Sequence, residues 1–259
     1  MSSELLTERE GATLILTLSD PATRNTLSPQ IYAAGIEALS VAESNDEVRC
    51  VVLRGDGAHF CSGGNLQRLA HNRSIGPDEQ RQSVDRFHSL IEALRTFPKP
   101  VIAAVEGYAA GGGFSLALAC DLIVAAQDAK FVMSYARAGL SPDGGSTWHL
   151  AQQLPRALAL QAIWLAEPLS PQQLLQFGLV NRVTDSGQAL PEALRLAERL
   201  ATMAPNALAC VKELVNGAPQ RRLREQLDAE REHFVANLFD ANGAEGLQAF
   251  FEKRSPRFR

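Results

Sequence analysis

The sequence lacks the features that mark several large classes of protein. Its four cysteines, Cys50, Cys61, Cys120 and Cys210, are too far apart for a zinc site and too few for a secreted disulfide scaffold. Neither sign of charge is in large excess: 25 basic and 29 acidic residues give a net charge of −4. Such a balance does not favour binding to nucleic acid or to an anionic membrane. We therefore expect a cytoplasmic protein with reduced thiols that binds small molecules or protein partners.

Targeting and membrane segments are also missing. The N-terminal MSSELLTEREGATL has no basic region followed by an apolar one, as a signal peptide would, and its acidic residues argue against a transit peptide. The richest apolar stretch, Val101 to Cys120, contains Glu106 and four glycines, so it is a poor candidate for a membrane span. We interpret this stretch as a buried strand, a loop and a helix.

Short aliphatic runs alternate with helical patterns in the first part of the chain. A hydrophobic content of 46% over 259 residues is enough for the large core of one α/β domain with a modest extension. The alternation predicts an α/β fold with a mainly parallel sheet. The expected strands are 12–18, 48–54, 101–105, 122–125 and 130–133, and the expected helices are 29–40, a segment from 78 to the stop at Phe97-Pro98, and 114–119.

From residue 150 onward the pattern becomes helical. The turn-like Asp185-Ser186-Gly187 divides an expected core, residues 1–185, from an expected helical region, residues 186–259. Neither an internal repeat nor a low-complexity segment is present. The expected helices of this part are 154–166, 171–177, 190–203, 206–216 and 223–239.

Two glycine-rich loops, Ser62-Gly63-Gly64 and Gly111-Gly112-Gly113, are candidates for the chemistry. The second precedes an apolar helix, whose first N–H groups are unpaired and lie at the positive end of the helix dipole. Such a terminus suits an anion or an oxyanion. Taken alone, the spacing favours a simple tight strand-to-helix turn. A nucleotide site fits poorly, because the loops match neither the P-loop nor the dinucleotide fingerprint.

The sequence around the loops carries a family resemblance. Residues 59–66, HFCSGGNL, closely resemble the F-C-[AS]-G-x-[DN]-[LI] segment of the crotonase (enoyl-CoA hydratase/isomerase) superfamily. Residues 99–113, KPVIAAVEGYAAGGG, followed by ACDLIVAA at 119–126, resemble the second signature of that family. Similarity continues at 139–145, 166–180 and 250–254, so it covers nearly the whole chain.

The resemblance implies a crotonase-like spiral of β-β-α units, with a C-terminal helical region that packs between the subunits of a homotrimer or homohexamer. It implies an acyl-CoA substrate, with CoA as part of the substrate and no further cofactor. By position, the N–H groups of Gly64 and Gly112 match the family's oxyanion hole. For CoA binding, the resemblance points to Arg24, to Ser62, Gly63 and Asn65 in the first loop, and to Phe250 and Lys253 from a neighbouring subunit. Alternatively, Arg24 and Lys253 are ordinary solvated charges and Phe250 is a core anchor of the last helix.

Two positions depart from the hydratase pattern. Ser115 and Tyr135 stand where hydratases of the family have two glutamates. A hydroxyl and a phenol cannot replace two carboxylates in activating water near neutral pH, so we expect weak or absent hydration of crotonyl-CoA. Ser115 is alternatively a nucleophile with Asp143 and His149 as partners, or only a residue of the first helical turn. Tyr135 orients a substrate or donates a proton, or is simply a buried tyrosine with one hydrogen bond.

Asp143 is the remaining candidate for acid-base catalysis. It matches a position where some isomerases and a dehalogenase of the family carry a catalytic aspartate, and one carboxylate suffices to move a proton between carbons. In Ser141-Pro142-Asp143-Gly144 it is alternatively a turn residue or a helix N-cap. Trp148 and His149 follow and are candidates for the wall of an acyl pocket, although packing explains Trp148 equally well.

Three functions stay open. The first is isomerisation of a double bond or a ring in an acyl-CoA, through an enolate and with Asp143; the motif around Asp143 most resembles family members that break down aromatic rings, such as those of the phenylacetate route. The second is an enoyl-CoA hydratase, or a hydrolase that opens a ring or cleaves an acyl-CoA. The third is a non-catalytic CoA-binding subunit, because both glutamates are missing.

Overall fold

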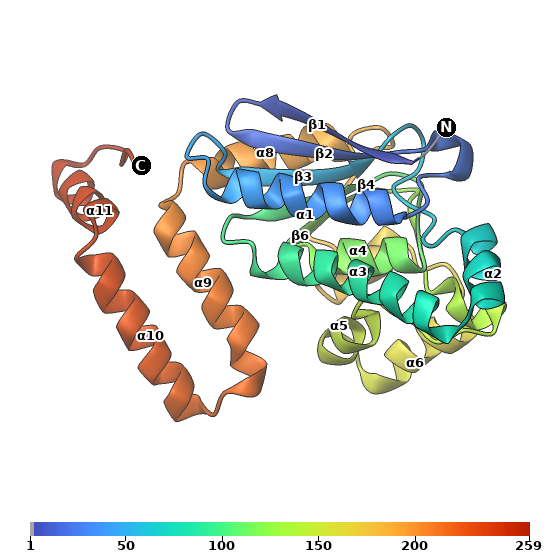
Figure 1. Ribbon diagram of the computed structural model, residues 1–259. Helices are drawn as coiled ribbons and strands as arrows, with labels where there is room; N and C mark the ends of the chain where they lie inside the picture. Colours follow the sequence, from blue (N-terminus) through green and yellow to red (C-terminus); the bar gives the residue numbers. More distant parts are fainter. Residues whose placement is uncertain (1–2) are drawn as a thin grey trace.

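The main sheet of the computed structural model, which describes residues 3–259, has six strands in the order β1-β2-β3-β4-β6-β8 (Figure 1). The strand β1 runs antiparallel to β2, and all the other neighbours are parallel. This confirms the predicted α/β fold with a mainly parallel sheet. The strands are β1 (Glu4–Glu10), β2 (Thr13–Ser19), β3 (Cys50–Gly55), β4 (Val101–Val105), β6 (Leu122–Ala126) and β8 (Arg182–Thr184).

Helices cover both faces of this sheet. Successive strand residues point to opposite faces. Val51 and Val101 pack in the larger core with α1, α3 and α4, whereas Val52 and Ile102 pack against α8. Burial on both sides explains why β4 is an apolar run without alternation. The helices of these layers are α1 (Pro29–Glu43), α3 (Pro77–Thr96), α4 (Gly112–Ala119) and α8 (Ala189–Ala201).

A second, small sheet joins the two glycine-rich loops. It pairs β5 (Tyr108–Ala110) with β7 (Lys130–Val132) in parallel, and Cys61 forms an isolated bridge to Ala109 at its edge. The remaining helices of the body are α2 (Leu66–Ile75), α5 (Ser146–Gln153), α6 (Arg156–Leu165) and α7 (Pro171–Gln176), with 3-10 turns at Pro21–Thr23 and Ser134–Ala138.

The last three helices extend away from the body as an arm (Figure 1). They are α9 (Pro205–Gly217), α10 (Leu223–Leu238) and α11 (Ala241–Glu252), with a 3-10 turn at Ala218–Gln220. The expected helical region, residues 186–259, contains these helices and also α8, which packs on the main sheet through Ala189, Ala193 and Ala197. The part of the chain that leaves the body therefore begins with α9.

Some elements escaped the sequence analysis. The strand β1 was not expected because its residues, ELLTERE, are polar and mostly exposed at the edge of the sheet. The helices α2 and α5 and the short strands β5 and β8 were missed as well, since they carry few regularly spaced apolar residues. None of the helices described for residues 3–259 combines the length and apolar character that a membrane crossing requires.

Candidate active site

The two glycine-rich loops lie against each other. The Ala110 N–H donates to the Cys61 carbonyl at 2.9 Å, and the Leu27 N–H donates to the Gly63 carbonyl at 2.9 Å. Gly63 has a φ of +88°, and a Cβ there would lie 2.6 Å from the Ala110 oxygen and 3.0 Å from the Gly112 nitrogen. Glycine is therefore needed at Gly63 both for its left-handed backbone and for the close approach of the second loop.

Two backbone N–H groups on these loops have no acceptor. Within residues 3–259, neither the Gly64 N–H nor the Gly112 N–H donates a hydrogen bond. Gly112 is the first residue of α4, so its N–H is one that the helix leaves unpaired, and the positive end of the helix dipole lies there. Two free donors on adjoining loops are what the stabilisation of an oxyanion requires.

Apolar and aromatic side chains form the wall beside Gly112. A Cβ at Gly112 would lie 3.1 Å from Leu27 Cδ1 and 3.6 Å from the Phe87 ring. The Tyr32 ring packs on Phe87 with centroids 5.4 Å apart, and burial raises the pKa of Tyr32. Phe87 lies in the helix predicted from residue 78, but nothing in the sequence placed Leu27 or Tyr32 at this site, because their positions depend on how α1 and the segment before it pack on α3.

Asp143 is the centre of a polar cluster. The Tyr135 hydroxyl donates to Asp143 Oδ1 at 2.5 Å, and the Ser115 hydroxyl donates to the Asp143 carbonyl at 3.0 Å. Burial, followed by the charge of Asp143, raises the pKa of Tyr135, so the phenol stays protonated and acts as a donor. The structure thus brings together three residues that the sequence analysis selected, from α4 and from the segment after β7.

The Asp143 side chain does not cap a helix. The N-cap of α5 is Gly145, and no side chain caps this terminus. The interpretation of Asp143 as an N-cap is therefore wrong. The following residue, Gly144, has a φ of +62°, and a Cβ there would lie 2.4 Å from the Phe87 ring and 2.8 Å from Ser115 Cβ, so this turn also requires glycine.

The hypothetical nucleophile arrangement of Ser115, Asp143 and His149 is not assembled. The Ser115 hydroxyl contacts the Asp143 carbonyl and not its carboxylate, and the His149 ring has no hydrogen bond to either residue in the described part of the chain. Burial, with a contribution from the charge of Arg95, lowers the pKa of His149 to about 4. Cys61 is fully buried, and burial raises its pKa to about 12, so its thiol stays protonated and packs as a small core side chain.

The remaining residues of the first loop have structural partners. The Ser62 hydroxyl donates to the Thr23 carbonyl at 3.0 Å, and its N–H donates to the Arg24 carbonyl at 2.9 Å. The Asn65 side chain caps α2 by accepting from the Gln67 and Arg68 N–H groups. The Arg24 backbone is therefore next to the loop, while its side chain is exposed.

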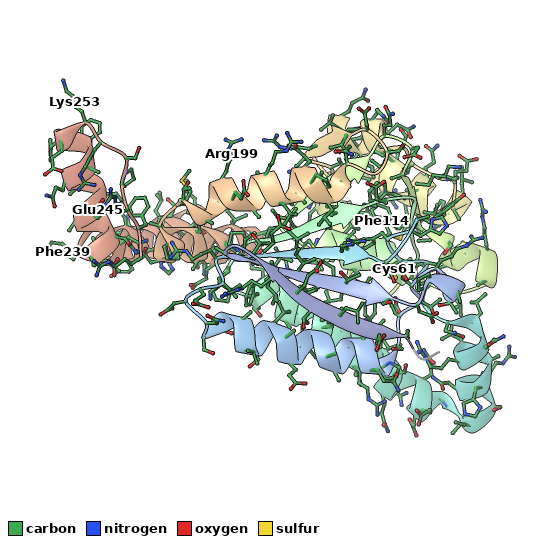
Figure 2. All side chains as sticks on the ribbon, turned by 90° about the horizontal axis from the view of Figure 1, so that it is seen from above. Cys61, Phe114, Arg199, Phe239, Glu245 and Lys253 are labelled. Atoms are coloured by element: carbon green, nitrogen blue, oxygen red, sulfur yellow. The ribbon has the colours of Figure 1, made fainter. Side chains whose placement is uncertain are left out.

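Phe250 and Lys253 lie far from these loops within one chain. Both belong to the end of the arm, and Figure 2 shows Lys253 at the opposite end of the molecule from Cys61 and Phe114. The Phe250 side chain is 78% exposed. The interpretation of Phe250 as a core anchor is therefore wrong.

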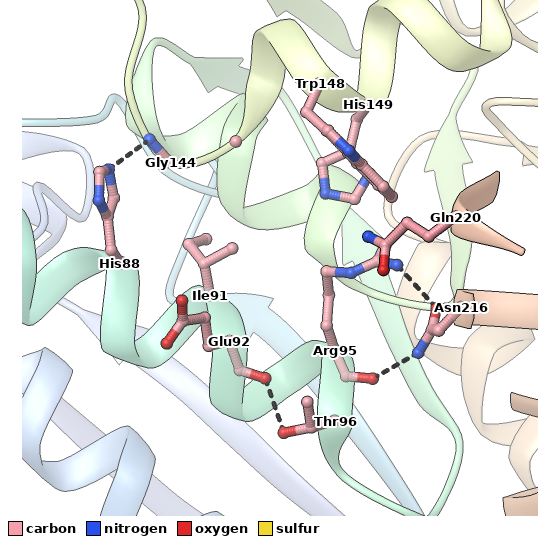
Figure 3. Close-up of a pocket in the computed structure, with 11 residues that line it drawn as sticks. His88, Ile91, Glu92, Arg95, Thr96, Gly144, Trp148, His149, Asn216 and Gln220 are labelled. Atoms are coloured by element: carbon pink, nitrogen blue, oxygen red, sulfur yellow. Dashed lines mark hydrogen bonds between the residues drawn. The ribbon is translucent and has the colours of Figure 1, made fainter. Parts of the chain in front are cut away.

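A cavity of about 450 Å³ continues from the turn after Asp143 (Figure 3). It lies between α3, α5 and the end of α9, and the Gly144 N–H donates to His88 Nε2 at 3.3 Å beside it. Trp148 and His149 were predicted to line an acyl pocket, whereas the lining residues from α3 and α9 were not predicted. The lining residues are His88, Ile91, Glu92, Arg95, Thr96, Gly144, Gly145, Trp148, His149, Asn216 and Gln220.

Comparison with known proteins of similar sequence and fold identifies the family. The family model described as enoyl-CoA hydratase/isomerase matches residues 8–259. The chain is 37% identical to 1,2-epoxyphenylacetyl-CoA isomerase of Escherichia coli (strain K12), covering 100% of this chain and 99% of the relative. It is 33% identical to 2,3-dehydroadipyl-CoA hydratase of the same strain, covering 99% of each.

A solved structure agrees closely with the fold. The crystal structure of an enoyl-CoA hydratase from Polaromonas sp. JS666 has a TM-score of 0.98 and 58% identity, covering 99% of this chain and 100% of that one. The crotonase-like fold expected from the two sequence signatures is confirmed. The chain belongs to the enoyl-CoA hydratase/isomerase family of acyl-CoA enzymes.

Proposed function

We propose that the protein isomerises an acyl-CoA thioester through an enolate, with Asp143 as the residue that moves the proton. The N–H groups of Gly64 and Gly112 hold the thioester oxygen. The observation that carries the proposal is the Asp143 carboxylate, held by Tyr135, in a site where Ser115 and Tyr135 replace the two glutamates of the hydratases.

The proposed chemistry balances with one carboxylate. Asp143 takes a proton from the carbon next to the thioester carbonyl, and the electron pair of that C–H bond moves through the carbonyl onto its oxygen, where the two N–H groups stabilise the charge. The double bond shifts, and Asp143 returns the proton to a different carbon. Because Tyr135 donates to Oδ1, the other oxygen, Oδ2, which has no partner within residues 3–259, is free to carry the proton.

The relatives support a CoA thioester as the substrate, but they include both an isomerase and a hydratase. A 1,2-epoxyphenylacetyl-CoA isomerase and a 2,3-dehydroadipyl-CoA hydratase are similar to this chain at 37% and 33% identity. We favour isomerisation, in a ring-breakdown route of the phenylacetate type, because the site has one carboxylate where water activation would use two.

We also propose a homotrimer or homohexamer in which the helical region of residues 186–259 contacts neighbouring subunits. Apolar side chains of the arm, such as Phe234 in α10, Phe239 directly after α10 and Phe251 in α11, are exposed in one chain. In this assembly Phe250 and Lys253 reach the CoA of a neighbour, whereas Arg24 and the backbone of Gly63 contact CoA in their own subunit. The reaction needs no cofactor beyond the CoA of the substrate.

One experiment separates the candidate reactions. The protein is incubated with 2-enoyl-CoA, 3-enoyl-CoA and arylacetyl-CoA derivatives, and the products are identified by chromatography and mass spectrometry. We expect isomers of unchanged mass. Water adducts or free acids formed at the rate of a dedicated enzyme would favour a hydratase or a hydrolase, and tight binding without any product would favour a CoA-binding subunit.

A further inference from the structure

The cavity beyond Asp143 contains one guanidinium that the proposed chemistry does not use. Arg95 projects from α3 into the cavity, where its guanidinium lies 4.5 Å from the centre of the Trp148 ring (Figure 3). Its Nη2 donates to Asn216 Oδ1 at 2.8 Å. Trp148 on one side and Asn216 on another therefore fix the guanidinium, which is how a binding group is preorganised.

No carboxylate neutralises Arg95 in the described part of the chain. Glu92, the only carboxylate among the lining residues, is exposed, forms no salt bridge, and points away from Arg95 in Figure 3. Asp121 is near enough to influence Arg95, but it forms a salt bridge with Lys212 at 2.8 Å. A half-buried positive charge without a counterion favours an anionic ligand.

The other lining groups add donors but no negative charge near Arg95. The Gln220 amide has no hydrogen-bond partner within residues 3–259 and lies beside the guanidinium in Figure 3. His149 is neutral near pH 7, since burial lowers its pKa to about 4, so one ring nitrogen still donates. The end of the cavity at Arg95 is therefore suited to carboxylate oxygens.

The cavity has the length for an extended acyl group. One end touches Gly144, directly after Asp143, and His88 lies there; the other end is at Arg95, seven residues further along α3. Seven residues of α-helix span about 10 Å. An acyl group whose thioester lies in the glycine loops and passes Asp143 thus points its far end toward Arg95.

We propose that Arg95 selects acyl-CoA substrates whose acyl group ends in a carboxylate. This inference rests on the proposed function, since it needs a CoA thioester in the glycine loops. The guanidinium pairs with the distal carboxylate, Trp148 and Asn216 hold the guanidinium in place, and the Gln220 amide adds a donor to the subsite.

The test is isothermal titration calorimetry of the full-length protein with two CoA thioesters of equal chain length. Adipoyl-CoA ends in a carboxylate, and its monomethyl ester has nearly the same shape without the charge. We expect the wild type to bind adipoyl-CoA roughly tenfold more tightly than the ester, as for a charge-assisted hydrogen bond. Equal affinity, or tighter binding of the ester, would overturn the inference even without any variant.

Two variants separate charge recognition from a structural role. Arg95→Gln removes the charge and should erase the preference for adipoyl-CoA. Asn216→Ala cuts the link between α3 and α9 but leaves the charge, so it should reduce the preference without erasing it. A preference that survives Arg95→Gln, or that is lost equally in both variants, contradicts the assignment. If neither thioester binds the wild type, the proposed function fails and this inference fails with it, whereas equal binding of both refutes this inference alone.

Discussion

The body of the protein and its C-terminal arm bury their apolar side chains to very different degrees. Phe60, Phe114 and Phe131 in the body are fully buried, whereas Phe239 and Phe250 in the arm are 84% and 78% exposed. The glycine loops and the Asp143 cluster are complete within the body. One chain therefore assembles the groups proposed for catalysis, but nothing within residues 3–259 covers the apolar side chains of its arm.

The largest effect is expected where the body holds the thioester oxygen. Gly112→Pro removes a proposed oxyanion donor at the first position of α4, where helices accept proline, although its Cβ would lie 3.1 Å from Leu27 Cδ1 and needs a small shift of that side chain. We expect turnover to fall roughly 100- to 1,000-fold, as measured by kcat on a CoA thioester that the wild type converts.

The matched control for this variant lies in the arm. Leu223→Pro removes the N–H at the equivalent first position of α10, after a residue whose extended backbone suits a following proline. Circular dichroism should show both variants folded. Unchanged kcat in folded Gly112→Pro would remove Gly112 from the oxyanion site and, with it, the assignment of the chemistry to the body.

The next effect tests the arm. Phe239→Asp places a charge on its most exposed phenylalanine, and we expect it to weaken subunit association roughly 100-fold, as seen by sedimentation velocity over a range of concentrations. Val41→Asp is the control, since Val41 is an isolated apolar residue on α1 that is 63% exposed and needs no partner. Wild-type size for Phe239→Asp would mean that this part of the arm is free in solution.

A smaller effect concerns the stability of the body. His149 is 2% exposed, and burial lowers its pKa from 6.5 to about 4. Between these two pH values the unfolded chain binds a proton at His149 that the folded chain does not bind. The contribution of the neutral, buried ring to stability is therefore fully present above about pH 6.5 and is lost as the pH falls toward 4. Between about pH 7 and pH 4.5 the free energy of unfolding should fall by roughly 2 kcal/mol more in the wild type than in His149→Gln.

Urea unfolding at the two pH values measures this difference. The exposed His71 provides the control, because His71→Gln removes an imidazole that folding does not bury. The His71→Gln variant should lose as much free energy of unfolding between the two pH values as the wild type does. Parallel losses in the wild type and His149→Gln would show that the buried ring is not the source.

The smallest effect is expected from the residue that positions Asp143. Tyr135→Phe removes the donor to Asp143 Oδ1 and keeps the ring, so kcat should fall roughly tenfold while KM changes little. Tyr108→Phe is the control, because the Tyr108 hydroxyl contacts neither Ser115 nor Asp143. A rise in KM with unchanged kcat would indicate that Tyr135 contributes to binding rather than to proton transfer.

The parts of the fold that were predictable are those whose apolar pattern is local. The segment Val101–Val105 was predicted as a strand buried on both faces because all five of its residues are apolar, and it is one. The polar edge strand β1 could not be found in this way, because it is held by pairing with β2 and not by burying its own side chains. Propensity and periodicity report burial, and they miss elements that are stabilised by main-chain pairing.

The candidate site was predictable where it depends on sequence signatures and not where it depends on packing. Ser115, Tyr135 and Asp143 were selected from the family resemblance, and the structure shows their contacts. Arg95 and Asn216 are 121 residues apart in the sequence, and they are in contact because the last turn of α9 lies beside the last turn of α3. No local pattern contains that contact, so only the folded chain reveals the charged end of the cavity.

The central claim is that Asp143 moves a proton on an enolate held by the glycine loops. Its most direct test is to incubate wild type and Asp143→Asn with a 3-enoyl-CoA in D2O and to follow both the double bond and the deuterium content of the acyl group. The wild type should form the 2-enoyl isomer, with deuterium at carbon wherever the proton on Asp143 exchanges with D2O before it is returned, and folded Asp143→Asn should form no isomer. Full isomerisation by Asp143→Asn, or a water adduct as the main wild-type product, would contradict the account.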